Sequence, residues 1–329
     1  MKVGAEKLEC PVVGQRTPEN FRTLSIGLTP MHTLALVTDV KSLSNDYDMP
    51  LLLDACRAID LAAEVCEWDD PTIDWPRFDA VLFRSPWDYV ERLVEFLAWG
   101  ERIAAVTRLF NPLSVARWSL DKLYLADLAA HGVPVVPSKF VGPTADPLLA
   151  LRDFFTAHPQ NDQIVVKPTV GHSSIDIQRY TRTREAEAAD HIARLLSEGC
   201  QVILQPYFES VDRDGETDLV YFDGVYSHAI RKEALLMPDG TVSAPALEFR
   251  KARTADEDER AVASAALDAV ASQLDLEQPL LYARIDLLRG DDGRPRVLEI
   301  ELCEPSLNLP FAEGSAMRFA RAVAGRLQS

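Results

Sequence analysis

Charged and apolar residues alternate in two segments near the C-terminus. The segment LLYARIDLLRG contains Arg284 and Asp286, and the segment RPRVLEIELCEP contains Glu299 and Glu301. Residues two apart on a β-strand share a face, so each pair projects from one side of its strand. If the intervening GDDG turn makes a hairpin, three carboxylates and one guanidinium converge there. Three carboxylates suit Mg²⁺, which completes its coordination with phosphate oxygens and water. The alternative is a solvated sheet face on which the acids and the arginine pair loosely.

A lysine and a polar loop offer a second set of ligands. Lys167 ends the β-branched run QIVVKP, and the loop behind it contains Gly171, His172, Ser173 and Ser174. Backbone N–H groups and hydroxyls in such a loop can donate to phosphate oxygens. The Gly-x4-Gly-Lys-Ser/Thr pattern of a Walker loop is absent. The alternative is a solvated lysine at the end of a strand.

The segment VILQPYFESVDRDGETDLV could bind a nucleoside. Gln205, Tyr207 and Phe208 follow a strand pattern, and in an extended segment they could meet the edge of a purine. Either Glu209 or Glu216 could then accept hydrogen bonds from ribose hydroxyls. The alternative is an aromatic plug of the core followed by a loop.

The end of an early strand offers candidates for a second substrate. Ligands of open α/β sheets bind beyond the carboxyl ends of the strands. The segment FRSPWDY places five polar or aromatic residues at such an end: Arg84, Ser85, Trp87, Asp88 and Tyr89. The alternative is a structural turn with a buried tryptophan. Two further cations, Arg231 and Lys232, follow the strand pattern YSHAI and could face phosphate or a carboxylate.

The elements that must position these residues change character along the chain. From residue 31 to about 113, strand and helix patterns alternate, which predicts parallel strands with crossover helices. The last third contains strand patterns joined at Asp223-Gly224 and at Gly290 to Gly293, which predicts antiparallel strands. The expected fold class is therefore α/β, with an α+β region after the first lobe. Residues 1–30 show no sustained period, and we expect a weakly structured extension there.

Charge and cysteine content narrow the classes of partner and compartment. The 329 residues include 34 basic and 51 acidic ones, and the net charge of -17 repels nucleic acid and anionic membranes. We therefore expect neither as a partner. Five cysteines without a CxxC pair are typical of reduced thiols in a cytoplasm. No long apolar run and no secretion signal are visible, which also favours a cytoplasmic protein.

In their order along the chain, these segments resemble the ATP-grasp superfamily of carboxylate–amine ligases. The likeness extends from Met31 to the C-terminus and rests on Lys122 in LDKLYL, Lys167 in VVKP, and the QPYF, ARID and LEIE segments. It implies an ATP-grasp fold in which two lobes clamp ATP. The implied domains are an N-terminal pre-ATP-grasp α/β domain at 31–113, a central lobe at 114–204 and a C-terminal lobe at 205–329.

The resemblance implies a role for each candidate residue. The residues expected at the ATP phosphates are Lys122, Lys167, Ser173 and Ser174. Those expected at adenine are Gln205, Tyr207 and Phe208, and Glu216 is expected at ribose. The expected ligands of two Mg²⁺ ions, with Mn²⁺ as an alternative, are Asp286, Glu299 and Glu301. Arg284 would stabilise the charge that builds up on an acyl phosphate, with Arg231 as a second catalytic arginine. Ser306 and Asn308 would join FRSPWDY at the substrate.

The sequence departs from the superfamily pattern in three places. Glu301 stands where the common motif has Asn, which keeps an oxygen ligand and adds negative charge. The stretch ELCEPS replaces the usual N-x-x-P-G, and the phosphate-loop region TVGHSSID contains less glycine. Glu304 in the first of these stretches could cap the loop, order Asn308 or face substrate. His172 or His228 could carry a proton, the alternative for each being a structural role.

The implied reaction is activation of a carboxylate by ATP to an acyl phosphate, followed by attack of a nitrogen. The segments RSPWDY, GETDLVYFDGVYSHAIRK and ELCEPSL resemble a branch of the superfamily that closes O-ureido-D-serine to D-cycloserine in antibiotic biosynthesis. ADP, phosphate, CO₂ and ammonia would be released. The alternatives are an intermolecular ligase of the glutathione synthetase or glutamate ligase kind, and a non-catalytic ATP-binding module. The expected partners are ATP and a small amino-acid-like substrate, and the resemblance allows a homodimer.

Overall fold

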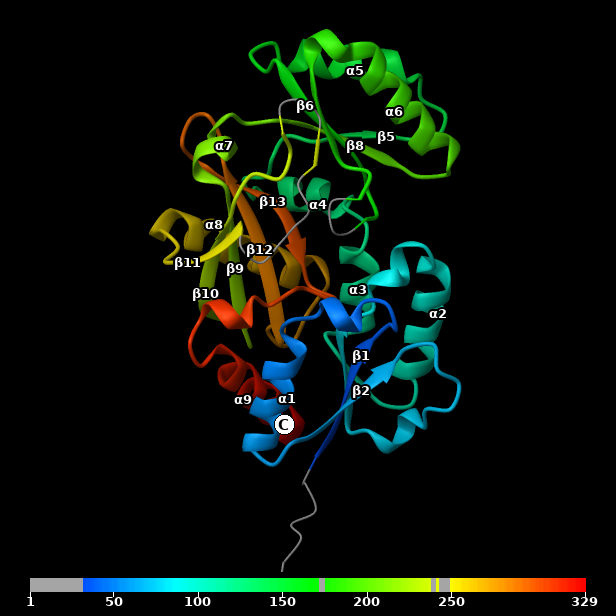
Figure 1. Ribbon diagram of the computed structural model, residues 1–329, viewed down its shortest axis with the longest axis vertical. Coiled ribbons are helices and arrows are strands. Elements are labelled where there is room, and N and C mark those ends of the chain that lie inside the picture. Colours follow the sequence, from blue (N-terminus) through cyan, green and yellow to red (C-terminus); the bar gives the residue numbers. More distant parts are fainter. Residues whose placement is uncertain (1–31, 172–174, 238–240, 243–248) are drawn as a thin grey trace, which may run out of the picture.

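The computed structural model describes residues 32–171, 175–237, 241–242 and 249–329. The extension predicted at 1–30 and the candidates His172, Ser173 and Ser174 lie outside these ranges. Three sheets, each with its own helices, make up the described part of the chain (Figure 1). The arrangement confirms the predicted α/β class, with a parallel sheet first and antiparallel sheets after it.

The first sheet is parallel and has the strand order β2-β1-β3-β4. Alternate residues of its central strands enter two different cores. Leu34 and Leu36 pack with the helix α1, whereas Val81 and Phe83 pack with the helix α2. This double coverage explains why the strands are almost continuously apolar. The elements are β1 (Thr33–Thr38), α1 (Met49–Ala58), β2 (Ala62–Glu67), β3 (Ala80–Ser85), α2 (Leu93–Ala104) and β4 (Arg108–Phe110).

The second sheet is antiparallel, with the strand order β5-β8-β6-β7, and lies at the top of Figure 1. Ile164 and Val166 of β6 pack beneath two helices, α5 and α6. Strand alternation turns Val165 and Lys167 to the other face. The elements are α3 (Leu113–Ser119), α4 (Tyr124–Ala130), β5 (Lys139–Val141), α5 (Pro147–Ala157), β6 (Gln163–Pro168), β7 (Gln178–Thr181), α6 (Glu185–Ser197) and β8 (Val202–Pro206).

The third sheet has five antiparallel strands in the order β11-β10-β9-β12-β13. Both predicted hairpins are present. The first turns at Asp223 and Gly224, whose φ angles of 50° and 74° suit a tight hairpin turn. The elements are α7 (Ser210–Asp214), β9 (Glu216–Phe222), β10 (Val225–Lys232), β11 (Arg250–Arg253), α8 (Glu257–Gln273), β12 (Tyr282–Arg289), β13 (Pro295–Glu301) and α9 (Ser315–Gln328).

Short 3-10 helices occur in the connections. They are η1 (Leu43–Asn45), η2 (Trp75–Arg77), η3 (Trp87–Val90), η4 (Arg182–Arg184) and η6 (Leu309–Phe311). The segment η3 follows β3 directly and carries the end of FRSPWDY. The sequence places FRSPWDY at the end of a strand, and the structure shows one turn of helix there that brings Tyr89 into the core.

The predicted domain boundaries do not coincide with the ends of elements. The boundary at 113/114 falls in the first turn of α3, and the boundary at 204/205 falls inside β8. The C-terminal helix α9 also returns to the first sheet, where Phe319 and Val323 join the core that contains Leu34 and Leu52 (Figure 1). The division at 31–113, 114–204 and 205–329 therefore remains a prediction.

Two further observations concern the described residues as a whole. None of their helices combines the length and the apolar character that a membrane span requires. Four cysteines lie in the described ranges, and all four are free thiols: Cys56, Cys66, Cys200 and Cys303.

Candidate active site

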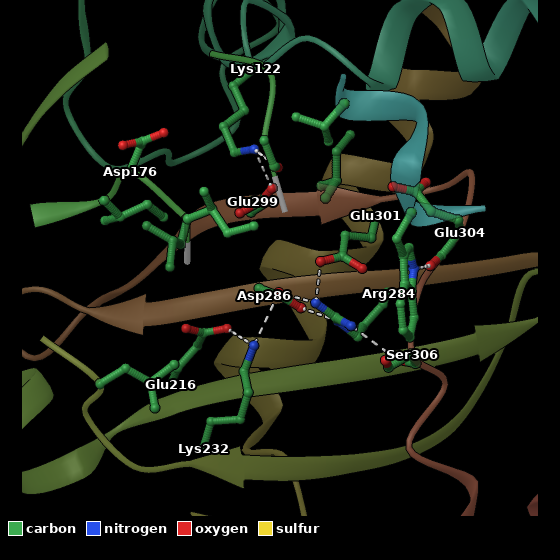
Figure 2. A pocket seen from close by; sticks show the side chains of 18 of the residues that line it. Lys122, Asp176, Glu216, Lys232, Arg284, Asp286, Glu299, Glu301, Glu304 and Ser306 are labelled. Carbon is green, nitrogen blue, oxygen red and sulfur yellow. Dashed lines mark hydrogen bonds and ion pairs between the residues drawn. The ribbon is translucent and has the colours of Figure 1, made fainter. Parts of the chain in front are cut away.

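A cleft of about 1040 Å³ collects residues from all three sheets (Figure 2). Asp39 and Trp87, which follow β1 and β3 of the first sheet, line it together with Val165 of the second sheet and Arg284 and Glu299 of the third. The charged side chains that Figure 2 labels come mainly from one face of the five-stranded sheet. The cleft is therefore lined by most of the site residues that the sequence predicts.

The strand register explains why charged residues gather on that face. Asp218 of β9 lies opposite Asp286 of β12, and Asp286 lies opposite Glu299 of β13. Two residues further along the same strands, Arg284 lies opposite Glu301. The predicted hairpin and the convergence of its charged residues are thus confirmed.

The other face of the same strands is apolar. Leu219, Ile285 and Ile300 are cross-strand neighbours there and pack against Ala266 and Val270 of α8. The two faces alternate along each strand. This alternation produces the pattern of charged and apolar residues that LEIE shows in the sequence.

Arg284 is held on the acidic face of the cleft by hydrogen bonds to two acids and a backbone carbonyl. Its Nε and Nη2 atoms each donate to Asp286 at 2.8 Å, Nη2 also contacts Glu301, and Nη1 donates to the Ser306 carbonyl at 3.1 Å. Burial works against ionisation of Asp286, yet Arg284 and Lys232 hold the pKa of that carboxyl well below its ordinary value. A bidentate guanidinium–carboxylate pair of this kind is geometrically rigid.

An acidic cluster forms beside Arg284. Oxygen atoms of Glu216, Asp218 and Asp286 lie within 4.8 Å of one another. Lys232 forms ion pairs with all three acids, with its Nζ atom 3.1 Å from Asp218 and 3.4 Å from Asp286. Burial raises the pKa of Asp218, and the negative charge of Asp286 adds to that effect.

The cluster differs from the metal ligands predicted from sequence, which are Asp286, Glu299 and Glu301. In the structure Glu299 pairs with Lys122 and Glu301 pairs with Arg284. Only Asp286 belongs to the three-acid cluster. Asp218 escaped the sequence analysis, although Glu216-Thr-Asp218 has the same two-residue spacing as the other acidic pairs.

The donor set fits Mg²⁺. The face offers carboxylate oxygens only, and hard oxygen ligands are what this cation prefers. Burial raises the pKa of Glu301 to about 8 despite Arg284, with Asp286 and Glu299 contributing like charge. More carboxylates are present than the neighbouring cations neutralise well, and a divalent cation would relieve that excess. Asp286, Glu299 and Glu301 line the cleft and are the residues best placed to hold it.

Two buried lysines lie near Glu299 at one edge of the sheet, and one of them contacts it. Lys122 Nζ lies 2.8 Å from a Glu299 oxygen and donates to the Gly171 carbonyl at 3.0 Å. Lys167 is 4% exposed, does not itself line the cleft and has no ion pair with another residue in the described ranges. Burial lowers the pKa of Lys167 to about 8, and the charge of Lys122 acts in the same direction. The structure thus brings the two predicted phosphate-binding lysines together.

The predicted adenine segment lies partly in the cleft. Tyr207 and Phe208 line the cleft, whereas Gln205 does not. Gln205 is buried, and its amide donates to Ser138 Oγ at 2.9 Å. The role predicted for the Gln205 amide is therefore corrected to a structural one. Of the two glutamates considered for ribose, Glu216 lines the cleft.

FRSPWDY is divided between the core and the cleft. Trp87, Asp88 and Tyr89 line the cleft. Arg84 and Ser85 are completely buried in β3, a strand inside the doubly covered sheet. Because side chains on both faces of such a strand enter a core, neither residue reaches the substrate. The predictions of substrate contacts for Arg84 and Ser85 are therefore wrong.

Arg84 instead holds the loop that follows β13. Its guanidinium lies 3.6 Å from Asp48 and 3.9 Å from Asp46, and Nη1 donates to the Pro305 carbonyl at 3.2 Å. Asp48 accepts hydrogen bonds from the backbone of the same loop, including Leu309 N–H at 2.8 Å. These contacts fix the backbone on which Ser306 is presented to the cleft.

The structure also corrects the prediction that Asn308, in the same loop, contacts the substrate. Asn308 is completely buried and does not line the cleft, so its side chain does not face the substrate pocket in this structure. Its amide donates to Asp218 at 3.3 Å, and its carbonyl oxygen accepts from Tyr47 at 2.8 Å and Arg250 at 3.0 Å. A φ of 55° places Asn308 in the left-handed region, which asparagine tolerates.

Arg231 points away from the cleft. Strand alternation turns its neighbour Lys232 into the cleft, while the Arg231 guanidinium donates to the carbonyls of Arg213 and Asp214. The catalytic role predicted for Arg231 is therefore corrected, and Lys232 is the cation that β10 supplies. The sequence contains both residues, but only the strand register decides which one faces the acids.

His228 and Glu304 differ in their access to the cleft. His228 is buried, and its Nε2 atom lies 2.9 Å from the Leu307 carbonyl. Burial lowers the pKa of His228 to about 4, which favours a neutral structural imidazole. Glu304 lines the cleft, and its backbone carbonyl accepts from Trp87 Nε1 at 3.1 Å. Burial raises the pKa of the Glu304 carboxyl.

Comparison with known proteins places this site in a family. The model of the N-terminal domain of the D-cycloserine synthetase DcsG matches residues 34–111. The cycloserine biosynthesis protein DcsG of Streptomyces lavendulae is 61% identical over 298 residues, which are 91% of this chain and all of that protein.

Solved structures agree with the sequence relatives. A crystal structure of D-cycloserine synthetase DcsG matches with a TM-score of 0.87 and 62% identity, over 90% of this chain and 99% of that one. The ATP-grasp ligase PsnB, solved with a minimal precursor, Mg and ADP, matches with a TM-score of 0.60 and 17% identity, over 90% of this chain and 98% of that one. The second likeness is one of fold. Taken with the acidic face and the buried arginine of the cleft, these matches show that the chain belongs to the DcsG family of ATP-grasp ligases.

Proposed function

We propose that this protein is an ATP-dependent ligase of D-cycloserine biosynthesis that closes O-ureido-D-serine to D-cycloserine. The observation that carries the proposal is Arg284, buried and held bidentately by Asp286 on the acidic face of the cleft. Such a rigid cation suits a reaction in which negative charge moves from a phosphate to a carboxylate and then to a tetrahedral centre. The 61% identity to a cycloserine biosynthesis protein supports the choice of substrate.

The proposed reaction balances as follows. A carboxylate oxygen of O-ureido-D-serine attacks the γ-phosphorus of ATP, and ADP leaves. The nitrogen bonded to the side-chain oxygen then attacks the acyl carbon, loses its proton and expels phosphate, which closes the five-membered ring. Water removes the carbamoyl group as CO₂ and ammonia. The sum is one substrate, one ATP and one water giving D-cycloserine, CO₂, ammonia, ADP and phosphate.

The residues of the cleft divide this work. Lys122 and Lys167 bind the triphosphate, and Tyr207 and Phe208 contact the adenine. Asp286, Glu299 and Glu301 would hold Mg²⁺, with Glu216 and Asp218 close to Asp286. Bound there, Mg²⁺ would neutralise charge on the phosphates and orient them for transfer. Arg284 holds the oxygen atoms of the reacting carboxylate, and its anchoring by Asp286 prevents reorientation during the reaction.

An intramolecular reaction explains why one small-molecule pocket is sufficient. The attacking nitrogen and the carboxylate belong to one molecule, so binding in a folded conformation supplies proximity. Trp87 and Tyr89 approach from the first sheet, and Ser306 approaches from the loop after β13. We propose that these side chains select the folded conformer and keep bulk water from the acyl phosphate.

A coupled assay of ADP formation tests the proposal. Purified protein with Mg²⁺ and ATP should form ADP and D-cycloserine with O-ureido-D-serine as the only other substrate. A requirement for a second amine would instead identify an intermolecular ligase. No substrate-dependent ADP with any amino acid would identify a non-catalytic ATP-binding module. Replacing Mg²⁺ by Mn²⁺, and titrating either ion, would measure how many ions are needed; we expect two.

We further propose that the protein acts in the cytoplasm as a homodimer, without nucleic acid or a membrane as partner. The free cysteines support a reducing compartment, and the net charge of -17 disfavours polyanionic partners. The dimer follows from the superfamily resemblance. Light scattering after size-exclusion chromatography would measure the mass in solution, and a mass of one chain would contradict the dimer.

A further inference from the structure

The cations that line the cleft differ in what they pair with. Lys122 pairs with Glu299, Lys232 pairs with the three-acid cluster, and Arg284 pairs with Asp286 and Glu301. Arg250 also lines the cleft and is half-buried, yet it has no ion pair with any carboxylate in the described ranges. A half-buried guanidinium without a counter-ion is ready to accept an anionic ligand.

Arg250 is nevertheless held in place. Its Nη1 atom donates to the Asn308 carbonyl oxygen at 3.0 Å, and its guanidinium lies 5.2 Å from the centre of the Tyr47 ring. Tyr47 donates to the same Asn308 oxygen at 2.8 Å. The amide of Asn308 donates to Asp218 in the acidic cluster. One buried side chain thus links Arg250 to the first sheet and to the candidate metal ligands.

The position of Arg250 separates it from the phosphate-binding lysines. It begins β11, which forms one edge of the five-stranded sheet, whereas Lys122 pairs with Glu299 on β13 at the opposite edge. Burial lowers the pKa of Arg250 to about 10, and the nearby charge of Arg284 acts in the same direction. Two guanidiniums therefore face the same part of the cleft, and the described carboxylates satisfy only Arg284.

Resting on the proposed function, we propose that Arg250 binds the carboxylate of the amino-acid substrate, the same group that receives the phosphoryl transfer. Among the described residues, neither Nε nor Nη2 of Arg250 has a hydrogen-bond acceptor, and a planar guanidinium matches a carboxylate better than a point charge does. The triphosphate and the carboxylate are the two anions of this reaction. Lys122 and Lys167 bind the triphosphate, and Arg250 and Arg284 bind the carboxylate. Asn308 and Tyr47 act as positioning residues that orient Arg250.

Steady-state kinetics with each substrate varied separately test this assignment. Arg250→Ala should raise the KM for O-ureido-D-serine about 10- to 100-fold, the loss expected for hydrogen bonds to a charged group. The KM for ATP should change less than about 3-fold. Arg250→Lys, which keeps the charge and loses the fork, should fall between wild type and Arg250→Ala. Tyr47→Phe keeps the ring but loses its hydrogen bond to Asn308, and it should raise the same KM about 2- to 5-fold.

The matched control is Lys251→Ala. Lys251 is the next residue of β11, its side chain is 63% exposed, and it pairs with Glu233 at 2.8 Å. Its removal should leave both KM values unchanged. Circular dichroism and a thermal midpoint for each variant would establish that the fold is retained.

A binding measurement that does not depend on turnover completes the test. Calorimetric titration should show that wild-type protein binds O-ureido-D-serine more tightly than its carboxamide, which lacks the negative charge. Arg250→Ala should lose most of that preference. Full preference in Arg250→Ala, or a rise confined to the KM for ATP, would overturn the assignment. If wild-type protein neither binds nor turns over O-ureido-D-serine, the proposed function itself fails, and this inference fails with it.

Discussion

Two buried arginines illustrate how similar residues take on different work in this protein. Arg84 in β3 faces two acids and Arg284 in β12 faces three. Each donates to a backbone carbonyl of one loop, Arg84 to Pro305 and Arg284 to Ser306. Arg84 lies wholly inside the protein, whereas Arg284 lines the cleft. They hold consecutive carbonyls of that loop.

The two clusters differ in how tightly the charges are paired. Arg284 contacts Asp286 at 2.8 Å through two nitrogen atoms, whereas Arg84 lies 3.6 Å from Asp48. Burial raises the pKa of Asp48 to about 6 although Arg84 opposes it, while the pKa of Asp286 is lowered. We conclude that the Arg84 cluster fixes a loop, whereas the Arg284 cluster is built to keep its charges in place beside a ligand.

Removing the enclosed arginine should have the largest effect on stability. Arg84→Met leaves Asp46 and Asp48 without their counter-ion in the core, and we expect the free energy of unfolding to fall by about 3 to 5 kcal/mol. Urea denaturation at pH 7 would measure it. Arg57→Met is the control, because Arg57 forms an exposed pair with Asp54, for which we expect about 0 to 1 kcal/mol. Equal losses in both variants would remove the distinction between the clusters.

Changing the arginine of the cleft should affect turnover instead. Arg284→Lys keeps a positive charge but loses the bidentate contact with Asp286, and we expect kcat to fall about 100- to 1,000-fold. The thermal midpoint should change much less than in Arg84→Met. A variant that keeps kcat within 3-fold of wild type would show that rigid anchoring of this charge is not needed.

The loop between the two arginines should make the protein sensitive to acid. His228 supports the Leu307 carbonyl, and its pKa falls to about 4 in the fold from 6.5 when unfolded. Protons therefore bind the unfolded chain first, and the stability present above pH 6.5 is lost as the pH falls toward 4. The loss amounts to about 3 kcal/mol. Unfolding of wild type and His228→Gln between pH 4 and 7 would measure it; parallel profiles would refute it.

The smallest effect is expected for the arginine that strand alternation turns outward. Arg231→Ala removes contacts with two backbone carbonyls only, so we expect kcat to stay within about 2-fold of wild type. Lys232→Ala is the comparison, since Lys232 pairs with the acidic cluster. A large loss of turnover in Arg231→Ala with normal turnover in Lys232→Ala would reverse the assignment of the two faces of β10.

Local patterns predicted much of the site because strand alternation is a local property. The pairs Arg284 with Asp286 and Glu299 with Glu301 are visible in the sequence, and the turn between them fixes their register. Asp218 was missed because its partner Asp286 lies on a strand far away in sequence. No local sequence pattern indicates that β9 and β12 are neighbours in the sheet.

Burial was the other property that the sequence did not reveal. Arg84 and Asn308 have the polar character of binding residues, and both are enclosed by contacts with distant segments. The opposite holds for Arg250, which lines the cleft although the sequence analysis did not select it. No motif singles it out, and only the arrangement of three sheets leaves its charge without an ion-pair partner among the described residues. Distant contacts thus decided which polar residues face the cleft.

The return of α9 to the first sheet has a consequence for how the chain is made. β4 ends at Phe110, whereas α9 begins at Ser315, so the first sheet is synthesised long before the helix that completes its core. Until then Leu34, Leu36 and Leu52 lack part of their cover. Exposed apolar surface of this kind is prone to aggregation. The first lobe therefore cannot complete its core before α9 has been synthesised.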